Sequence, residues 1–246
     1  MQKNKYTILS NRLIAKETFR LDLEGDASEV VRGGQFADVA VEGFYLRRPL
    51  AVTEWSGRGM SLIYKVVGQG TRELSAMAPG STLDILTGLG NGFDAGACRS
   101  AALIVCGGIG ASPAFSLAKE LIAAGRKVRA VLGFNTKDEI ILADEYRALG
   151  AEVTVTTVDG SAGTKGFVTG VLQEAAQGCD YFYTCGPKVM MKAVCEALDG
   201  LDGEASLEER MGCGCGICYG CTCHTADGPR RVCADGPVFK KSKILW

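Results

Sequence analysis

The stretch from Ala101 to Pro113 reads AALIVCGGIGASP, and it decides the fold of the chain. Its first six residues are continuously apolar, as in a parallel strand that helices cover on both faces. The glycine-rich turn Gly107–Gly110 follows directly, and an amphipathic stretch then continues to about Ala124. A strand, a glycine turn and a helix in this order are typical of a nucleotide-binding α/β unit, because the turn brings backbone N–H groups and the helix dipole towards a pyrophosphate.

The same alternation continues downstream of this unit. The predicted elements are, in order, a strand at 128–134, a helix at 137–149, a strand at 152–158, a helix at 166–176, a strand at 181–184 and a helix at 187–198. Strands that alternate with helices predict a doubly wound parallel sheet. Ligands of such sheets bind outside the carboxyl ends of the strands.

The residues upstream of this sheet have a different pattern. Short runs of alternating apolar and polar residues, separated by turn residues, predict strands at 18–23, 37–41, 61–67 and 82–86. One short helix is predicted near 71–77. Short strands at regular spacing favour a small antiparallel barrel.

Two strand ends of the predicted sheet carry glycine. Gly107–Gly110 is not the G-x-G-x-x-G fingerprint, because Pro113 stands where a third glycine would be needed. The glycines could simply permit a tight turn. However, Thr184–Pro187 places a second glycine at the end of another strand, and two such ends on one sheet edge favour a nucleotide site.

The barrel region contains two further candidate phosphate sites. Arg47 and Arg48 precede Pro49, and an arginine fork suits a phosphate, although the spacing alone favours a solvated surface pair. Gly68–Thr71 lies just before the predicted helix. It could hold a phosphate or form an ordinary turn with Thr71 as the N-cap.

Six of the 11 cysteines lie between residues 213 and 233. Cys213, Cys218 and Cys221 have the C-x4-C-x2-C spacing of plant-type [2Fe–2S] proteins, and Cys233 is available as the fourth thiolate. Four thiolates also satisfy tetrahedral zinc, but zinc motifs usually pair two C-x2-C units. The x4 gap and the glycines of this segment favour the iron–sulfur cluster.

The remaining cysteines are not predicted to be ligands. Cys215 and Cys223 would break the spacing of the motif. The upstream cysteines lie mostly in apolar or helical stretches and are interpreted as small core residues. The single histidine, His224, excludes a Rieske centre, which needs two.

The composition excludes several classes of protein. Of 246 residues, 47% are apolar and 22% charged, as in a globular protein of one or two ordinary domains. Lys and Arg number 27 against 28 acids, so no basic surface for nucleic acid or membrane lipid is expected. The sequence shows neither a signal peptide nor an apolar run of about 18 residues. We therefore expect a cytoplasmic protein, whose cysteines bind metal or carry out redox chemistry.

The order of these motifs resembles the ferredoxin–NAD(P)⁺ reductase superfamily. More closely, the chain resembles the electron-transfer subunits of the B-type, NAD-dependent dihydroorotate dehydrogenases. This closer resemblance rests on Leu46-Arg47-Arg48-Pro49, Asp159-Gly160-Ser161 with Lys165–Thr169, Glu209-Arg210-Met211, the cysteine array and Asp235–Phe239. It implies a multidomain fold with an antiparallel β-barrel FAD domain at 1–96, a doubly wound α/β NAD domain at 97–203 and a small [2Fe–2S] subdomain at 204–246.

The resemblance also assigns residues to cofactors. FAD contacts are implied for Arg48, Pro49, Leu50, Ala51, Ile63, Tyr64, Lys65, Gly70 and Thr71. NAD contacts are implied for Gly107, Gly108, Gly110, Cys185, Gly186 and Pro187. The cluster ligands would be Cys213, Cys218, Cys221 and Cys233. Ala51 departs from the family, which usually has serine near the reactive edge of the flavin.

The implied activity is an electron relay in pyrimidine biosynthesis. Electrons would pass between NAD(H), FAD and the cluster, and on to FMN in a separate catalytic subunit that converts dihydroorotate to orotate, in a heterotetramer of two subunits of each kind. No catalytic acid or base is expected, since the cofactors carry the chemistry. NAD is favoured over NADP because Asn135–Glu139 offers acids for a ribose hydroxyl and no arginine.

Two alternatives remain. One is the small flavin subunit of an NADH-dependent ferredoxin:NADP⁺ oxidoreductase or sulfide dehydrogenase, although its cluster typically has an acidic ligand. The other, from a different class, is a nucleotide-binding module with structural zinc.

Overall fold

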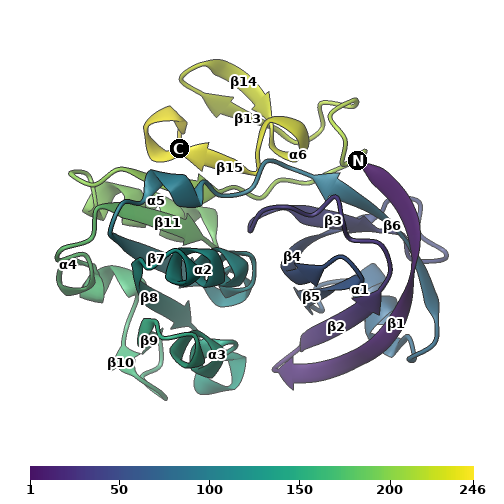
Figure 1. The fold of residues 1–246 in the computed structure, drawn as a ribbon, viewed down its shortest axis with the longest axis horizontal. Helices are drawn as coiled ribbons and strands as arrows, with labels where there is room; N and C mark the ends of the chain where they lie inside the picture. The colour runs from purple at the N-terminus through teal and green to yellow at the C-terminus, as the bar shows by residue number, and fades with distance from the viewer.

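The N-terminal part of the chain forms a closed barrel (Figure 1). In the computed structural model, which describes residues 1–246, six antiparallel strands close in the order β1-β2-β5-β4-β3-β6. They are β1 (Gln2–Ala15), β2 (Thr18–Glu24), β3 (Phe36–Val39), β4 (Arg48–Ser56), β5 (Gly59–Lys65) and β6 (Thr82–Leu89). Helix α1 (Gln69–Ala76) connects β5 to β6. The predicted antiparallel barrel is therefore confirmed.

Two barrel strands were not among the predicted elements. The alternation of β1 is broken by irregularities between Ile8 and Ser10 and between Leu13 and Ala15. A bulge of this kind shifts the side chains from one face to the other, which hides the strand from a period-of-two test. In β4 the pair Arg48-Pro49 opens the strand, where a proline is tolerated.

The second half of the chain forms a seven-stranded sheet in the order β10-β9-β8-β7-β11-β12-β15. Its strands are β7 (Ala101–Gly107), β8 (Lys127–Phe134), β9 (Glu152–Thr157), β10 (Thr164–Lys165), β11 (Tyr181–Cys185), β12 (Gly203–Ser206) and β15 (Val238–Lys240). All pairings are parallel except that of β15 with β12. The prediction of a parallel α/β sheet is correct.

Helices cover both faces of this sheet, as the doubly wound prediction requires. They are α2 (Pro113–Ala123), α3 (Ala143–Ala148), α4 (Leu172–Ala175) and α5 (Lys188–Ala197). On one face Ile104 of β7 shares a core with Leu117 of α2 and Tyr146 of α3. On the other face Val105 shares a core with Val194 of α5. Consecutive residues of β7 thus point into different cores, which explains the continuous apolar run.

Two predicted helices are shorter than expected. The stretch 137–149 contains a 3₁₀ turn, η3 (Lys137–Glu139), and then only α3, because Leu142 has a positive φ of 58° that interrupts the helix. The stretch 166–176 begins with the 3₁₀ turn η4 (Val168–Val171) before α4. Both differences lie at helix starts, where tight turns are frequent.

The C-terminal segment extends the sheet and carries the cysteines. After β12 the chain forms the cysteine loop and the hairpin β13 (Thr222–Thr225) and β14 (Gly228–Arg231), followed by α6 (Val232–Asp235), β15 and η5 (Lys241–Lys243). In Figure 1 this yellow-green segment lies across the top of both the barrel and the sheet. The predicted boundary at residue 203 falls inside β12. No helix of the structure is long and apolar enough to cross a membrane.

Direct contacts join the barrel to the sheet. The hydroxyls of Thr53 in β4 and Ser112 before α2 lie 2.6 Å apart and are buried. Next to them, Lys119 of α2 donates to Glu54 at 2.7 Å. Because β4 opens with Arg48-Pro49 and α2 follows the glycine turn, these contacts place the two predicted nucleotide motifs on elements that pack together.

Candidate functional site

The four predicted cluster ligands are arranged as two pairs. The side chain of Cys213 interacts with that of Cys218, and the side chain of Cys233 interacts with that of Cys221; Cys213 also has the Cys215 side chain as a neighbour. Cys221 and Cys233 are buried, whereas Cys218 is exposed. Cys233 reaches its partner because α6 begins directly after β14 and returns to the loop.

Backbone N–H groups point at the sulfurs of these same four residues. Five such bonds are present: Ile217 N to Cys213 Sγ at 3.2 Å, Cys218 N to Cys213 Sγ at 3.4 Å, Gly220 N to Cys218 Sγ at 3.4 Å, Cys233 N to Cys221 Sγ at 3.3 Å and Gly216 N to Cys233 Sγ at 3.1 Å. Cys215 and Cys223 accept none of them. Four of the six cysteines thus accept N–H groups. They are the three of the C-x4-C-x2-C motif and Cys233, the same four that were predicted as ligands.

This arrangement fits a two-iron cluster better than a single metal ion. In a [2Fe–2S] cluster held by four cysteines, two thiolates bind each iron, so the sulfurs are expected in two pairs. The paired thiols and the N–H groups around them are the features that a cluster of this kind requires.

The electrostatics of the loop also suit thiolate ligands. Burial opposes ionisation of Cys213, but N–H groups of the loop outweigh it and lower the pKa of its thiol to about 6. Burial and the neighbouring Cys221 thiol raise the pKa of Cys233 to about 12. A metal cation bound here would displace the proton of the Cys233 thiol.

Asp38 of β3 lies against the cysteine loop and was missed by the sequence analysis. It is only 2% exposed, and its Oδ1 atom has no hydrogen-bond partner. A Cβ atom on Gly214 would lie 2.5 Å from its Oδ2 atom. Burial raises the pKa of this carboxyl to about 6, against the opposing effect of Arg47 and with a further contribution from Cys213. The only signal in the sequence is an acidic residue inside an apolar strand.

The predicted FAD residues of β4 and α1 come together. The guanidinium of Arg48 lies over Gly70, where a Cβ atom would be 2.2 Å from Nε, and it stacks on Phe44 at 4.7 Å. The Thr71 hydroxyl accepts from Val67 N at 3.0 Å and from Gly68 N, which is the N-cap of α1. The helix thus begins before Thr71, and the expectation of Thr71 as N-cap is wrong because Gly68 already has the extended backbone of that position.

The other predicted FAD residues differ in exposure. In β4, Pro49 is exposed, and Leu50 and Ala51 are half-buried. In β5, the Tyr64 side chain points into the barrel core and its hydroxyl donates to Asn11 Oδ1 at 3.0 Å.

The two neighbours of Tyr64 in β5 face the sheet. Ile63 packs in the core shared with the sheet. Lys65 pairs with Glu139 at 3.3 Å. Glu139 is therefore engaged, and Asp138 is the exposed acid left in the segment predicted to bind the ribose.

The predicted NAD residues lie at the carboxyl ends of two neighbouring strands of the sheet. Strands β7 and β11 are neighbours, and Cys106 pairs with Cys185 at their ends. A Cβ atom on Gly110 would lie 2.3 Å from Cys185 O, and one on Gly186 would lie 2.9 Å from Gly107 N. Only glycine permits these two turns to pack backbone against backbone. Chain connections leave β7 and β11 towards opposite faces, so this edge is the switch point of the sheet.

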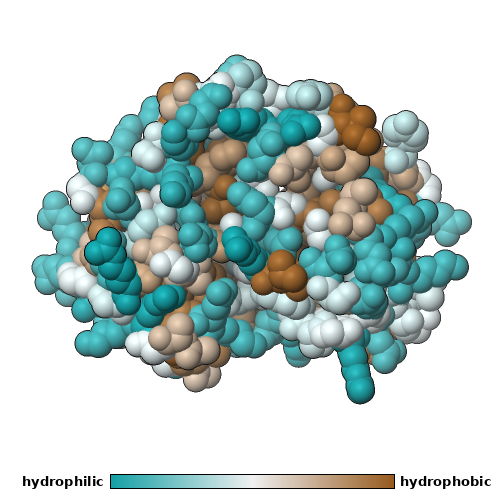
Figure 2. Space-filling model, turned by 45° about the horizontal axis from the view of Figure 1, so that its top comes forward, coloured by the Kyte–Doolittle hydropathy of each residue, from teal (hydrophilic) through white to brown (hydrophobic).

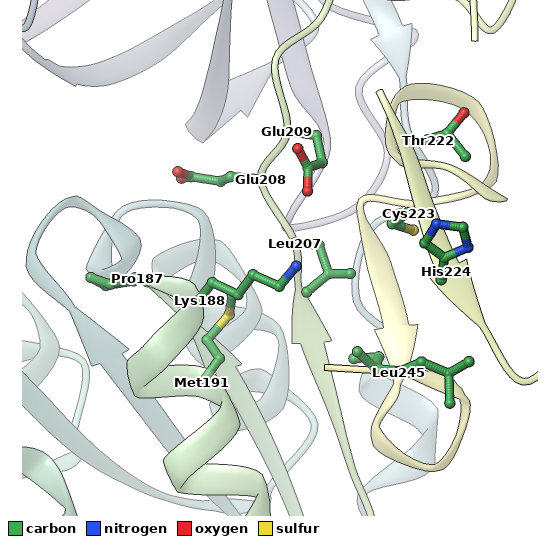
Figure 3. Close-up of a pocket in the computed structure, with 12 residues that line it drawn as sticks. Pro187, Lys188, Met191, Leu207, Glu208, Glu209, Thr222, Cys223, His224 and Leu245 are labelled. Atoms are coloured by element: carbon green, nitrogen blue, oxygen red, sulfur yellow. The ribbon is translucent and has the colours of Figure 1, made fainter. Parts of the chain in front are cut away.

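The remaining two residues of this edge face open space. A Cβ atom on Gly108, which has a φ of 53°, would meet no atom within 4 Å. Pro187 lines a cavity of about 270 Å³ between the start of α5 and the C-terminal hairpin (Figure 3). In that view Lys188 extends from α5 towards Leu207, and His224 lies on the hairpin side. The cavity thus joins the sheet edge to the segment that carries the cysteines.

A barrel that packs on a doubly wound sheet, together with a paired cysteine loop, defines a reductase of the ferredoxin–NADP⁺ reductase type. Residues 208–245 match the iron–sulfur cluster binding domain of dihydroorotate dehydrogenase B, and residues 104–196 match the oxidoreductase NAD-binding domain. The chain is similar to "Dihydroorotate dehydrogenase B (NAD(+)), electron transfer subunit" from Geobacillus sp. (strain WCH70), with 42% identity over 100% of this chain and 99% of the relative. The protein of the same name from Bacillus caldolyticus is 41% identical over 99% of this chain and 98% of its own. The chain belongs to this family of electron-transfer subunits.

Solved structures agree with the fold. The structure of an NADH-dependent reduced ferredoxin-NADP oxidoreductase superposes with a TM-score of 0.89 at 31% identity, over 98% of this chain and 90% of that chain. A flavohemoglobin from Malassezia yamatoensis with bound FAD and heme superposes with a TM-score of 0.66 at 18% identity, over 81% and 57% of the two chains. With the family matches, these findings confirm an oxidoreductase subunit that uses FAD, NAD(H) and an iron–sulfur cluster.

Proposed function

We propose that this chain carries electrons between NAD(H) and the FMN of a dihydroorotate dehydrogenase catalytic subunit, in a cytoplasmic heterotetramer of two subunits of each kind. The observation that carries the proposal is the pairing of four thiols in a loop that packs on Asp38 of the barrel, in a chain whose relatives are named electron-transfer subunits. When bound, the cofactors convert the two-electron chemistry of nicotinamide into single-electron transfer.

The residues of the chain then bind and orient the cofactors. We assign Cys213, Cys218, Cys221 and Cys233 as ligands of a [2Fe–2S] cluster. Of the predicted FAD residues, Arg48 offers its fork beside the start of α1, and Ile63, Tyr64 and Lys65 contribute mainly backbone, because their side chains are engaged elsewhere. At the sheet edge, Gly107, Gly108, Gly110 and Gly186 let a dinucleotide approach the backbone. We retain 1–96, 97–203 and 204–246 as the functional units of the chain.

The surface of the cysteine loop is suited to contact with a partner protein that exchanges electrons with the cluster. Ile217 is 78% exposed and Tyr219 is 65% exposed, and both lie within the C-x4-C-x2-C segment. Figure 2 shows apolar side chains in small separate groups among hydrophilic ones on the face where the top of Figure 1 comes forward. Exposed apolar side chains next to a cluster suit a protein surface that brings another redox centre close.

The proposal is tested by co-expressing the chain with a dihydroorotate dehydrogenase catalytic subunit. We expect the two to co-purify with FAD, FMN and iron, and the complex to reduce NAD⁺ when dihydroorotate is added, whereas neither subunit does so alone. A colourless chain that contains one zinc ion and no flavin would contradict the proposal and favour the zinc-binding module.

The structural similarity to the NADH-dependent ferredoxin-NADP oxidoreductase supports a second candidate. A chain of that class would exchange electrons between NADH and a flavoprotein partner that uses NADPH and ferredoxin. Supplying ferredoxin and NADPH with and without dihydroorotate separates the two. Dihydroorotate-independent turnover alone would favour the second candidate.

A further inference from the structure

Arg231 at the end of β14 connects the two parts of the cysteine segment. Its Nε and Nη2 atoms donate to the two carboxylate oxygens of Asp235 at 3.0 and 3.1 Å. Its Nη1 atom donates to Gly216 O at 2.8 Å, and its guanidinium lies 5.1 Å from the ring centre of Tyr219. One side chain thus joins the helix that holds Cys233 to the loop that holds the other three thiols.

The contact with Gly216 acts on a peptide group that faces sulfur. The carbonyl that accepts from Arg231 and the N–H of Ile217 belong to the same peptide unit. That N–H donates to Cys213 Sγ at 3.2 Å. A cation that bonds to the oxygen of a peptide orients the unit and polarises its N–H, so the bond to sulfur becomes stronger.

The close approach depends on the local backbone. Gly216 has a φ of 86°, and a Cβ atom there would lie 2.7 Å from Ala234 Cβ and 3.3 Å from Arg231 Nη1. The guanidinium is itself fixed, because Asp235 also accepts from Arg231 N at 2.8 Å. Neighbouring groups therefore hold both partners of this contact in place.

We propose that Arg231, held by Asp235, is a positioning residue that sets the reduction potential of the iron–sulfur cluster by orienting the Gly216–Ile217 peptide towards Cys213. The inference rests on the proposed cluster site. Hydrogen bonds donated to the sulfurs and nearby positive charge both raise the potential of a cluster, because both stabilise its more negative reduced form. Removing the arginine therefore destabilises the reduced cluster.

If Arg231 acted only through its positive charge, removing any nearby arginine would shift the cluster potential equally, and Arg230 provides the control. Arg230 is the neighbouring residue, exposed and without a side-chain hydrogen bond in the structure. The variant R230Q removes the same charge and leaves the peptide contact intact. The variant D235N separates the two explanations by sign, since losing a negative charge raises the potential, whereas releasing the arginine lowers it.

The experiment is a redox titration of the FAD-loaded full chain, followed by the EPR signal of the reduced cluster. At a fixed ambient potential near the midpoint, R231Q and R231K are expected to lower the ratio of reduced to oxidised cluster about tenfold, or about 59 mV for one electron. R230Q is expected to change the ratio less than about threefold. D235N is expected to shift the potential in the same direction as R231Q.

A wild-type potential in R231Q, equal shifts in R230Q and R231Q, or a raised potential in D235N would each overturn the inference. If R231Q retains FAD but loses the cluster, R231K and D235N decide by the same criteria. If R231Q fails to fold, R231K and D235N decide by the same criteria. A wild-type chain without any cluster would instead contradict the proposed function.

Discussion

Glu204 gives the sharpest prediction for stability. It lies in β12 and is only 5% exposed, and its Oε2 atom accepts from Asp94 N at 3.0 Å. Burial raises the pKa of this carboxyl from 4.5 to about 7, although the hydrogen bond from Asp94 N opposes the shift. The carboxylate of Asp94 adds to the rise, whereas Lys240 and Arg32 oppose it. The Tyr183 hydroxyl also donates to Asp94 O at 2.8 Å, so this group fixes the linker between barrel and sheet.

The sign follows from proton binding. Between pH 4.5 and about 7 the folded chain holds a proton that the unfolded chain has released. The contribution of Glu204 to stability is therefore fully present below pH 4.5 and is lost as the pH rises through about 7. The shift corresponds to an upper value of about 3 kcal/mol.

The variant E204Q removes this loss, because glutamine stays neutral and its Oε1 atom can accept from Asp94 N. Relative to wild type, E204Q should gain up to about 3 kcal/mol between pH 4.5 and pH 8. For a chain of this size that equals about 6–12 °C in apparent Tm. Calorimetric scans of both proteins at equal rates from pH 4.5 to 8 measure the difference.

The control is E120Q, since Glu120 is an exposed residue of α2 without a side-chain hydrogen bond or ion pair. Its difference in Tm from wild type should stay constant across the same pH range. A difference for E204Q that is flat, or that falls with rising pH, would refute the assigned state of the Glu204 carboxyl.

Three further predictions concern the cofactor sites. The variant C218S should lose the cluster absorbance but retain FAD and NADH-dye reduction. The control C223S should keep the cluster, FAD and NADH-dye reduction. An intact cluster in C218S would reject the proposed ligand set. G110A places a Cβ atom 2.3 Å from a carbonyl oxygen of β11 and should cost about 1–3 kcal/mol and raise the KM for NADH, unlike G170A, where a Cβ atom meets nothing within 4 Å. A51S should raise NADH-dye turnover about two- to tenfold by restoring one hydrogen bond, and an unchanged rate in stopped-flow assays would remove the proposed role of this position.

The fold could be predicted where periodicity is undisturbed. The run at Ala101–Cys106 is apolar throughout, because both faces of β7 are buried, and it predicted the central strand. The bulges of β1 and the positive φ of Leu142 arise from tertiary packing, and no local propensity signals them. The return of β15 to the sheet depends on a contact between segments more than thirty residues apart, which spacing cannot show.

The sequence predicted those cluster ligands that lie close together along the chain. The C-x4-C-x2-C spacing selected three cysteines within nine residues, and the structure supplies what the spacing lacks, namely the pairing of Cys213 with Cys218 and of Cys221 with Cys233. Asp38 escaped prediction because its importance comes from a loop about 175 residues away. Arg231 escaped for the same reason, since an arginine in a hairpin has many ordinary uses.

The path of the C-terminal segment explains how three cofactor sites are held together without a flexible linker. The segment leaves the sheet as β12, beside the strand that ends in Cys185, and returns antiparallel to it as β15. Between these strands the cysteine loop packs on Asp38 of the barrel. Asn91, in the linker from barrel to sheet, donates to Val238 O at 2.8 Å and accepts from Val238 N at 3.1 Å. Electron transfer depends steeply on distance, so the packing of the loop on Asp38 and the bonds between Asn91 and Val238 matter because they hold the cofactor sites at a fixed separation.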